Sequence, residues 1–129
     1  MKNDKNVIKF IHYHKLDADE FVLVTERPKH CKDLYVLQNE KRYPLTEEES
    51  RKIVKQLANV LIKLEKKGIA HRDVKLENIL YDLDKDNIKL IDFGLATTFT
   101  PGELFNQFYG EELSEIMLPL LNLRISEFL

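Results

Sequence analysis

The chain has 129 residues, enough for one domain, and its 43% hydrophobic and 33% charged residues are typical of a soluble globular protein. The net charge of −2 gives no indication of binding to nucleic acid or to an anionic membrane. The single cysteine, Cys31, excludes a disulfide-stapled scaffold, and without a signal peptide or a membrane-spanning apolar run we expect a cytoplasmic or nuclear protein.

Two short apolar runs near the start, at residues 7–11 and 21–24, predict a pair of strands with polar residues between them. Pro28 ends the second run, because proline fixes φ and lacks the N–H that a strand ladder uses. We expect a polar connection from Pro28 to Asp33.

The clearest helix is predicted over residues 47–67. Thr46 and Glu49 have the spacing of a capping box, and Gly68 stands where a glycine commonly ends a helix. Apolar side chains recur at three- and four-residue steps and form one stripe: Ile53, Val54, Leu57, Leu61 and Leu64.

Three short apolar segments follow, at residues 69–70, 79–81 and 88–91, and they predict small strands on either side of two polar loops. The last part of the chain differs in charge, since residues 103–129 hold five acidic residues and one basic residue. A loose helical pattern of apolar residues runs through this segment.

The two polar loops carry the chemistry. Residues 71–94 read HRDVKLENILYDLDKDNIKLIDFG, with H-R-D-x-x-x-x-N followed, 14 residues after the Asn, by D-F-G. This pair of motifs resembles the signature of protein kinases. Phosphoryl transfer needs a carboxylate that accepts a hydroxyl proton, for which Asp73 is suited, and oxygen ligands for Mg²⁺, for which Asn78 and Asp92 are suited. Lys75 is placed to reach the transferred phosphate.

Residues 21–28, FVLVTERP, resemble the hinge of PIM-family serine/threonine kinases. The resemblance implies that ATP is the cofactor, with its adenine against this segment, and that Thr25 is the gatekeeper. Because Pro28 has no N–H, the main-chain carbonyl of Glu26 is the group expected to bond to the adenine.

Two further acids have a role by the same resemblance. Asp33 is expected to bind the ribose or a basic substrate, and Glu77 to select protein substrates with basic residues near the Ser or Thr. For each of these residues the alternative is a plain surface acid. Three threonines fall where an activation loop is expected, and their phosphorylation and pairing with Arg72 is a hypothesis: Thr97, Thr98 and Thr100.

The resemblance implies an α+β fold, a truncated protein-kinase-like domain that combines small-lobe antiparallel strands with the first part of a mostly helical large lobe. The expected organisation is a partial domain at 1–110, with strands at 6–25, the hinge at 26–33, the long helix at 46–68 and the catalytic and DFG loops at 71–94, and then a divergent segment at 111–129.

Several parts of a kinase are not in this sequence. The Gly-rich loop, the Lys of the third strand and the Glu of the C helix precede the hinge in the family, and the 20 residues before Phe21 contain no glycine. We therefore expect weak or no catalysis by the isolated chain, since such groups supply much of the positioning and charge stabilisation. Two functions stay open: an incomplete serine/threonine kinase that transfers the γ-phosphate of ATP to protein, and a non-catalytic lobe mimic that binds and regulates a full-length kinase or its substrate.

Overall fold

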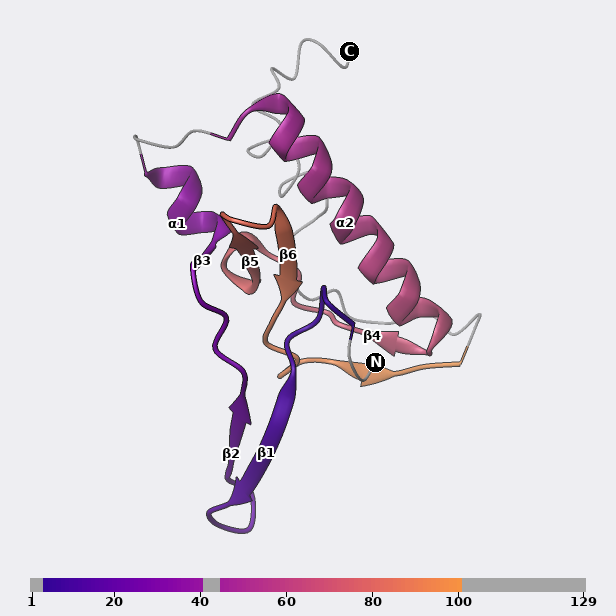
Figure 1. The fold of residues 1–129 in the computed structure, drawn as a ribbon. Coiled ribbons are helices and arrows are strands. Elements are labelled where there is room, and N and C mark those ends of the chain that lie inside the picture. The colour runs from indigo at the N-terminus through magenta and orange to yellow at the C-terminus, as the bar shows by residue number, and fades with distance from the viewer. Residues whose placement is uncertain (1–3, 41–44, 101–129) are drawn as a thin grey trace.

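The computed structural model describes residues 4–40 and 45–100, and these residues form the expected α+β fold (Figure 1). The elements in chain order are β1 (Phe10–Lys15), β2 (Phe21–Thr25), β3 (Cys31–Asp33), α1 (Leu34–Asn39), α2 (Glu47–Lys66), β4 (Ile69–Ala70), the 3-10 helix η1 (Leu76–Asn78), β5 (Ile79–Asp82), β6 (Asn87–Leu90) and β7 (Thr97–Thr98). The strands pair into small antiparallel sheets, β1–β2, β3–β5–β6 and β4–β7. The segment at 111–129 lies outside the described residues.

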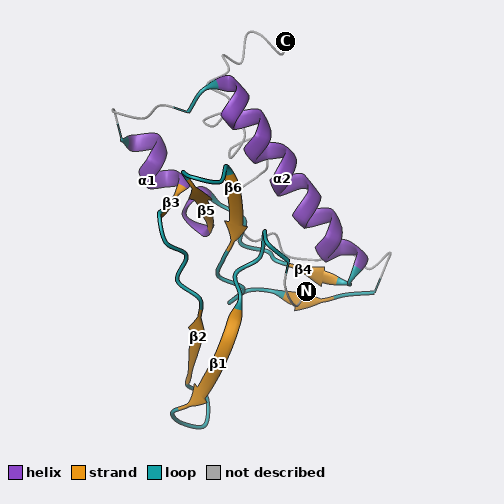
Figure 2. Ribbon diagram, in the orientation of Figure 1, coloured by secondary structure: helices purple, strands orange, loops and turns teal. Residues whose placement is uncertain are grey.

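Strands β1 and β2 form a hairpin that projects away from the two helices (Figure 2). Five large apolar side chains of these two strands are more than half exposed: Phe10, Ile11, Tyr13, Phe21 and Leu23. The second strand matches its prediction, but the first does not. It begins at Phe10 and continues through the polar stretch that ends at Lys15.

The prediction for the first strand was wrong because residues 6–8 pair elsewhere. Ile8 N–H donates to the carbonyl of Leu90 and Leu90 N–H donates to the carbonyl of Asn6, at 3.0 and 2.8 Å. Val7 thus forms a parallel bridge with Leu90 at the edge of β6. The N-terminal segment is attached to the body of the molecule before the hairpin leaves it.

Helix α2 confirms the strongest prediction from the sequence. Thr46 Oγ1 accepts from Glu49 N–H and the Glu49 carboxylate accepts from Thr46 N–H, which completes the capping box. The helix ends at Lys66, and Gly68 follows with a φ of +67°. That left-handed backbone turns the chain into β4, where the Gly68 carbonyl accepts from Phe99 N–H at 2.9 Å.

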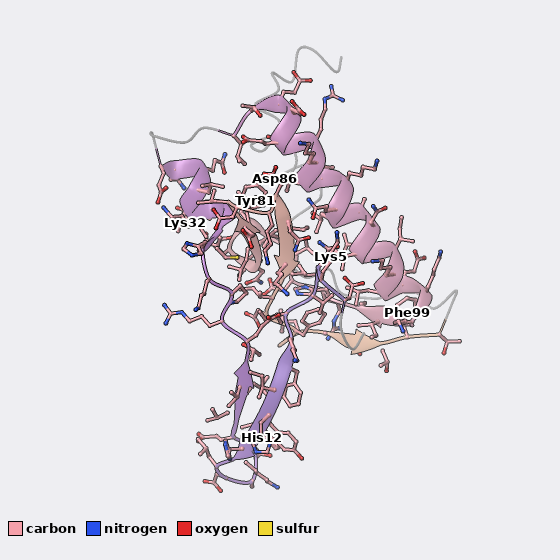
Figure 3. All side chains as sticks on the ribbon, viewed as in Figure 1. Lys5, His12, Lys32, Tyr81, Asp86 and Phe99 are labelled. Atoms are coloured by element: carbon pink, nitrogen blue, oxygen red, sulfur yellow. The ribbon has the colours of Figure 1, made fainter. Side chains whose placement is uncertain are left out.

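The core lies where α1 and α2 pack against β5 and β6. Its buried members are Leu34, Leu37, Ile53, Leu57, Val60, Leu64, Leu76, Ile79, Tyr81, Ile88 and Leu90. Figure 3 shows Tyr81 beside Asp86, and the Tyr81 hydroxyl donates to the Asp86 carboxylate at the turn between β5 and β6. Burial, with this bond second, raises the pKa of Tyr81 above its ordinary value.

The segment after Pro28 contains more structure than the predicted polar connection. Cys31 starts β3, which pairs with β5, and Asp33 then caps α1 by accepting from Val36 N–H at 2.8 Å. Burial, with the charge of Asp82 second, raises the pKa of the Cys31 thiol, which favours its unreactive form. Within the described ranges, no helix is long and apolar enough to cross a membrane.

Candidate active site

The loop between β4 and η1 is organised around His71, which is 3% exposed. His71 Nδ1 accepts from Asp73 N–H at 3.1 Å, so the ring proton is on Nε2, which donates to the carbonyl of Ile91 at 2.8 Å. The Phe93 ring meets the imidazole edge-on, with 4.7 Å between ring centroids. Burial lowers the pKa of His71, which keeps the ring neutral and suited to these two bonds.

Asp73 is held by a second side chain from the same loop. Asn78 Nδ2 donates to the Asp73 carbonyl at 2.9 Å and to Asp73 Oδ2 at 3.1 Å. The Lys75 ammonium lies 3.7 Å from Asp73 Oδ1, and these two side chains are 38% and 16% exposed. A carboxylate, an amide and an ammonium group therefore meet within six residues of sequence.

Asp92 is brought to the same place by the β5–β6 ladder. Ile79 is opposite Leu90, and one step further along the Asn78 carbonyl accepts from Ile91 N–H at 2.9 Å. Asp92 follows Ile91 directly, so the two loops that carry the sequence motifs lie side by side. Asp92 Oδ1 accepts from Gly94 N–H at 3.1 Å.

Two residues of this site have a backbone that disfavours L side chains. Arg72 has a φ of +66° and Asp92 a φ of +57°. Such conformations cost free energy and persist where surrounding contacts hold them. Arg72 Nε donates to the carbonyl of Leu95 at 2.7 Å, which attaches the loop at 71–78 to the segment after D-F-G.

The oxygen atoms of this site fit Mg²⁺. The Asn78 side chain makes its two hydrogen bonds to Asp73 through Nδ2, which leaves Oδ1 as its ligand atom for a cation. Asp92 is exposed and has a second carboxylate oxygen besides the one that accepts from Gly94 N–H. Mg²⁺ is commonly held by one or two such side chains together with phosphate and water oxygens. In the part of the chain described, no three His, Cys, Asp or Glu side chains group as a metal site.

The remaining predicted site residues lie on neighbouring elements. Glu26 follows β2, Asp33 lies at the N-cap of α1, and Glu77 is exposed on η1. Asp33 Oδ1 is engaged as the helix cap, which leaves Oδ2 for a ligand. Antiparallel pairing of β3 with β5 sets Asp33 opposite Leu80, two residues after Asn78.

Sequence reasoning missed two polar residues that connect the hairpin to the body. Lys89 on β6 donates to Glu26 Oε1 at 2.7 Å. Asn6 is 5% exposed and donates to Gln56 Oε1, Asn87 Oδ1 and the Ile88 carbonyl. Alternation along β6, which sets Lys89 between buried Ile88 and Leu90, was the available signal for the lysine, but nothing in the sequence indicated its partner.

Comparisons with known proteins agree with this geometry. The family model described as "Protein kinase domain" matches residues 1–113. The zebrafish (Danio rerio) serine/threonine-protein kinase pim-2 is 35% identical over 106 residues, which is 82% of this chain and 34% of that protein. The human NUAK family SNF1-like kinase 1 is 37% identical over 97 residues, 75% of this chain and 14% of that protein. The chain thus spans about a third of the length of the first relative and about a seventh of the second.

A solved structure shows the same fold. The Cydia pomonella granulovirus kinase PK-1 superposes with a TM-score of 0.66 and 32% sequence identity, over 74% of this chain and 37% of the viral protein. The two loops that meet at Asn78 and Ile91 lie within residues 1–113, which the family model matches. On this similarity of sequence and fold the chain belongs to the protein kinase family, as a partial, PIM-like serine/threonine kinase domain.

Proposed function

We propose that this chain provides the catalytic loop, the magnesium ligands and the hinge of a serine/threonine kinase that phosphorylates proteins. The observation that carries the proposal is the contact of Asn78 with both Asp73 and Ile91, which sets a carboxylate for proton transfer beside the metal-ligand segment at Asp92. Catalysis of phosphoryl transfer is largely positioning and charge stabilisation, so this arrangement is what the reaction requires.

MgATP, when bound, supplies the γ-phosphoryl group and neutralises its charge. Asp73 accepts the proton of the substrate Ser or Thr hydroxyl as that oxygen bonds to the γ-phosphorus and the bond to the β-phosphate oxygen breaks. The bond from Asn78 to Oδ2 orients the carboxylate and leaves lone pairs of Oδ1 for the hydroxyl. Lys75, 3.7 Å from Oδ1, adds positive charge beside the phosphoryl group. Asn78 and Asp92 would hold the magnesium ion.

The adenine would lie against the segment that follows β2, where the Glu26 carbonyl accepts from the exocyclic amine. Pro28 has no N–H to offer, so the hinge would provide one main-chain bond rather than two. Asp33 Oδ2 would accept from the ribose hydroxyls or from a basic substrate. Glu77 is exposed and would favour peptides with arginine or lysine near the phosphorylated residue.

The proposed activity is tested with the purified chain, MgATP and a basic Ser-containing peptide, with phosphopeptide formation followed by mass spectrometry. We expect slow transfer that Asp73→Asn abolishes. The matched control is Asp84→Asn, a carboxylate in the exposed turn between β5 and β6. Equal transfer by the wild type and Asp73→Asn would overturn the assignment of the base.

A second candidate function is a non-catalytic lobe mimic that binds a full-length kinase or its substrate. The exposed apolar hairpin favours it, since the Phe10, Tyr13 and Phe21 side chains are each 53% exposed and exposed apolar clusters commonly mark interaction surfaces. Tight co-elution with an intact PIM-like kinase, without any MgATP binding by the chain itself, would favour the mimic. Binding of MgATP would favour the enzyme.

A further inference from the structure

Glu26 is fixed at three points that have no part in adenine binding. Its main-chain N–H donates to the Lys9 carbonyl at 2.9 Å, and its Oε1 accepts from Lys9 N–H at 2.8 Å. The same Oε1 accepts from Lys89 Nζ at 2.7 Å. The Glu26 side chain therefore holds neighbouring segments together, while its main-chain carbonyl is the group proposed to bind adenine.

The hydrogen-bonded ion pair between Lys89 and Glu26 has the features of a strong interaction. The two side chains are only 20% and 28% exposed, and charge-assisted hydrogen bonds of this length are stronger than neutral ones. The bond to Lys89, more than any other contact, lowers the pKa of the Glu26 carboxyl, so this group stays ionised at neutral pH.

The position of Lys89 connects the two halves of the nucleotide site. Lys89 is on β6, next to Leu90, whose main chain bonds to Asn6 and Ile8, and Asp92 follows three residues after Lys89. One ion pair thus joins the residue after β2 to the strand that ends at the proposed magnesium ligand. Bonds from Lys9 and the segment at 6–8 brace the same junction.

We propose that Lys89 is a positioning residue for nucleotide selection. By holding the Glu26 carboxylate, Lys89 sets the Glu26 carbonyl at a fixed distance from Asp92. One nucleotide can then bind with its adenine at Glu26 and its magnesium-bound phosphates near Asp92 at the same time. This inference rests on the proposed function, because it assumes that adenine lies at the Glu26 carbonyl and the phosphates near Asp92.

Two ligands separate positioning from general stability. The affinity of the full chain is measured by calorimetry for ATP and for inorganic tripolyphosphate, both with saturating Mg²⁺. Tripolyphosphate has the phosphates without the adenine. The wild-type chain is expected to bind ATP more tightly than tripolyphosphate. Lys89→Met is expected to weaken ATP binding about tenfold, an effect of the size expected for one charged hydrogen bond, and to leave tripolyphosphate binding unchanged.

The control variants define the cause. Lys89→Arg retains a charged donor for Glu26 and should restore the preference for ATP. Glu26→Gln keeps an oxygen for Lys9 N–H but removes the negative charge that strengthens the bond from Lys89, so it should weaken ATP binding in the same direction as Lys89→Met. Lys52→Met removes a lysine from an exposed pair with Glu48 on α2 and should change neither affinity. Glu26→Gln also provides the answer if Lys89→Met fails to fold.

Each outcome decides between the proposals. Equal weakening of both ligands in Lys89→Met and in Glu26→Gln, or an unchanged preference for ATP, overturns the role of Lys89 and leaves the proposed function standing. A wild-type chain that binds ATP no better than tripolyphosphate overturns adenine binding at the hinge, and the inference about Lys89 with it.

Discussion

Asn78 donates its side-chain amide to both the main-chain carbonyl and the Oδ2 carboxylate oxygen of Asp73, at 2.9 and 3.1 Å. The donor is 5% exposed, so water cannot easily replace it. The side chain of Asn78 thereby orients Asp73 and at the same time determines the conformation of the loop between them. One amide serves both the stability and the chemistry of the site.

Asn78→Ala should lower the free energy of unfolding by about 1–3 kcal/mol, because it leaves the partly buried carbonyl and carboxylate of Asp73 without their donor. Urea denaturation at pH 7 measures this change. The control is Asn39→Ala. The side-chain amide of Asn39 donates to the main-chain carbonyl of Tyr35 at an exposed position, and its loss should cost no more than about 0.5 kcal/mol. Equal costs for the two variants would contradict the role given to Asn78.

Gly68→Ala should destabilise the connection between α2 and β4. The residue has a φ of +67°, and a Cβ atom there would lie 2.7 Å from the main-chain oxygen of Phe99, so the main chain itself would have to shift. The left-handed backbone alone costs an L residue about 1–2 kcal/mol, and the close approach adds to it. A fall in Tm well beyond that of Lys67→Ala is expected, and a Tm equal to that control would refute the explanation.

Local signals in the sequence were enough for the elements that neighbouring residues determine. The capping box of Thr46 and Glu49, the apolar stripe and Gly68 predicted α2 to within a residue, because each of these signals acts over four residues or fewer. The short strands at β4, β5 and β6 were predicted within a residue for the same reason. The H-R-D and D-F-G motifs were equally local.

Long-range contacts account for what the sequence could not predict. The first strand was misplaced because Val7 pairs with Leu90, and a pairing across so much of the chain leaves no local pattern. The helix α1 has only six residues, too few for an apolar period to be recognised. The sequence indicated Glu26 for its carbonyl, whereas its side-chain partner Lys89 became visible only in three dimensions.

Stability should depend on pH through His71. Burial holds its pKa below the ordinary value of 6.5, so the unfolded chain binds this proton more readily than the folded one. The contribution is fully present above pH 6.5 and is lost as the pH falls below it, with a slope of at most about 1.4 kcal/mol per pH unit for one proton. Urea titrations between pH 7.5 and pH 5.5 measure the slope.

The control for this pH dependence is His71→Gln, which has no titrating group at the position. The carboxylates that lie nearest the ring, Asp73 and Asp92, remain in this variant, so subtracting its curve isolates the imidazole. The slope of the variant below pH 6.5 should be shallower than that of the wild type. An identical slope would show that the imidazole is not the group responsible.

The same substitution should cost much more stability in the core than in the projecting hairpin. Leu57 on α2 is 1% exposed, and Leu57→Ala should cost about 2–5 kcal/mol because it leaves a cavity in the core. Leu23 on β2 is 65% exposed, and Leu23→Ala should change the free energy of unfolding by no more than about 0.5 kcal/mol. Urea denaturation of the two variants measures both costs, and because each variant replaces Leu by Ala, the two positions differ only in their surroundings. A cost of 2 kcal/mol or more at Leu23 would mean that the hairpin is packed against another part of the chain in solution, whereas a negligible cost leaves its apolar side chains free to contact another polypeptide.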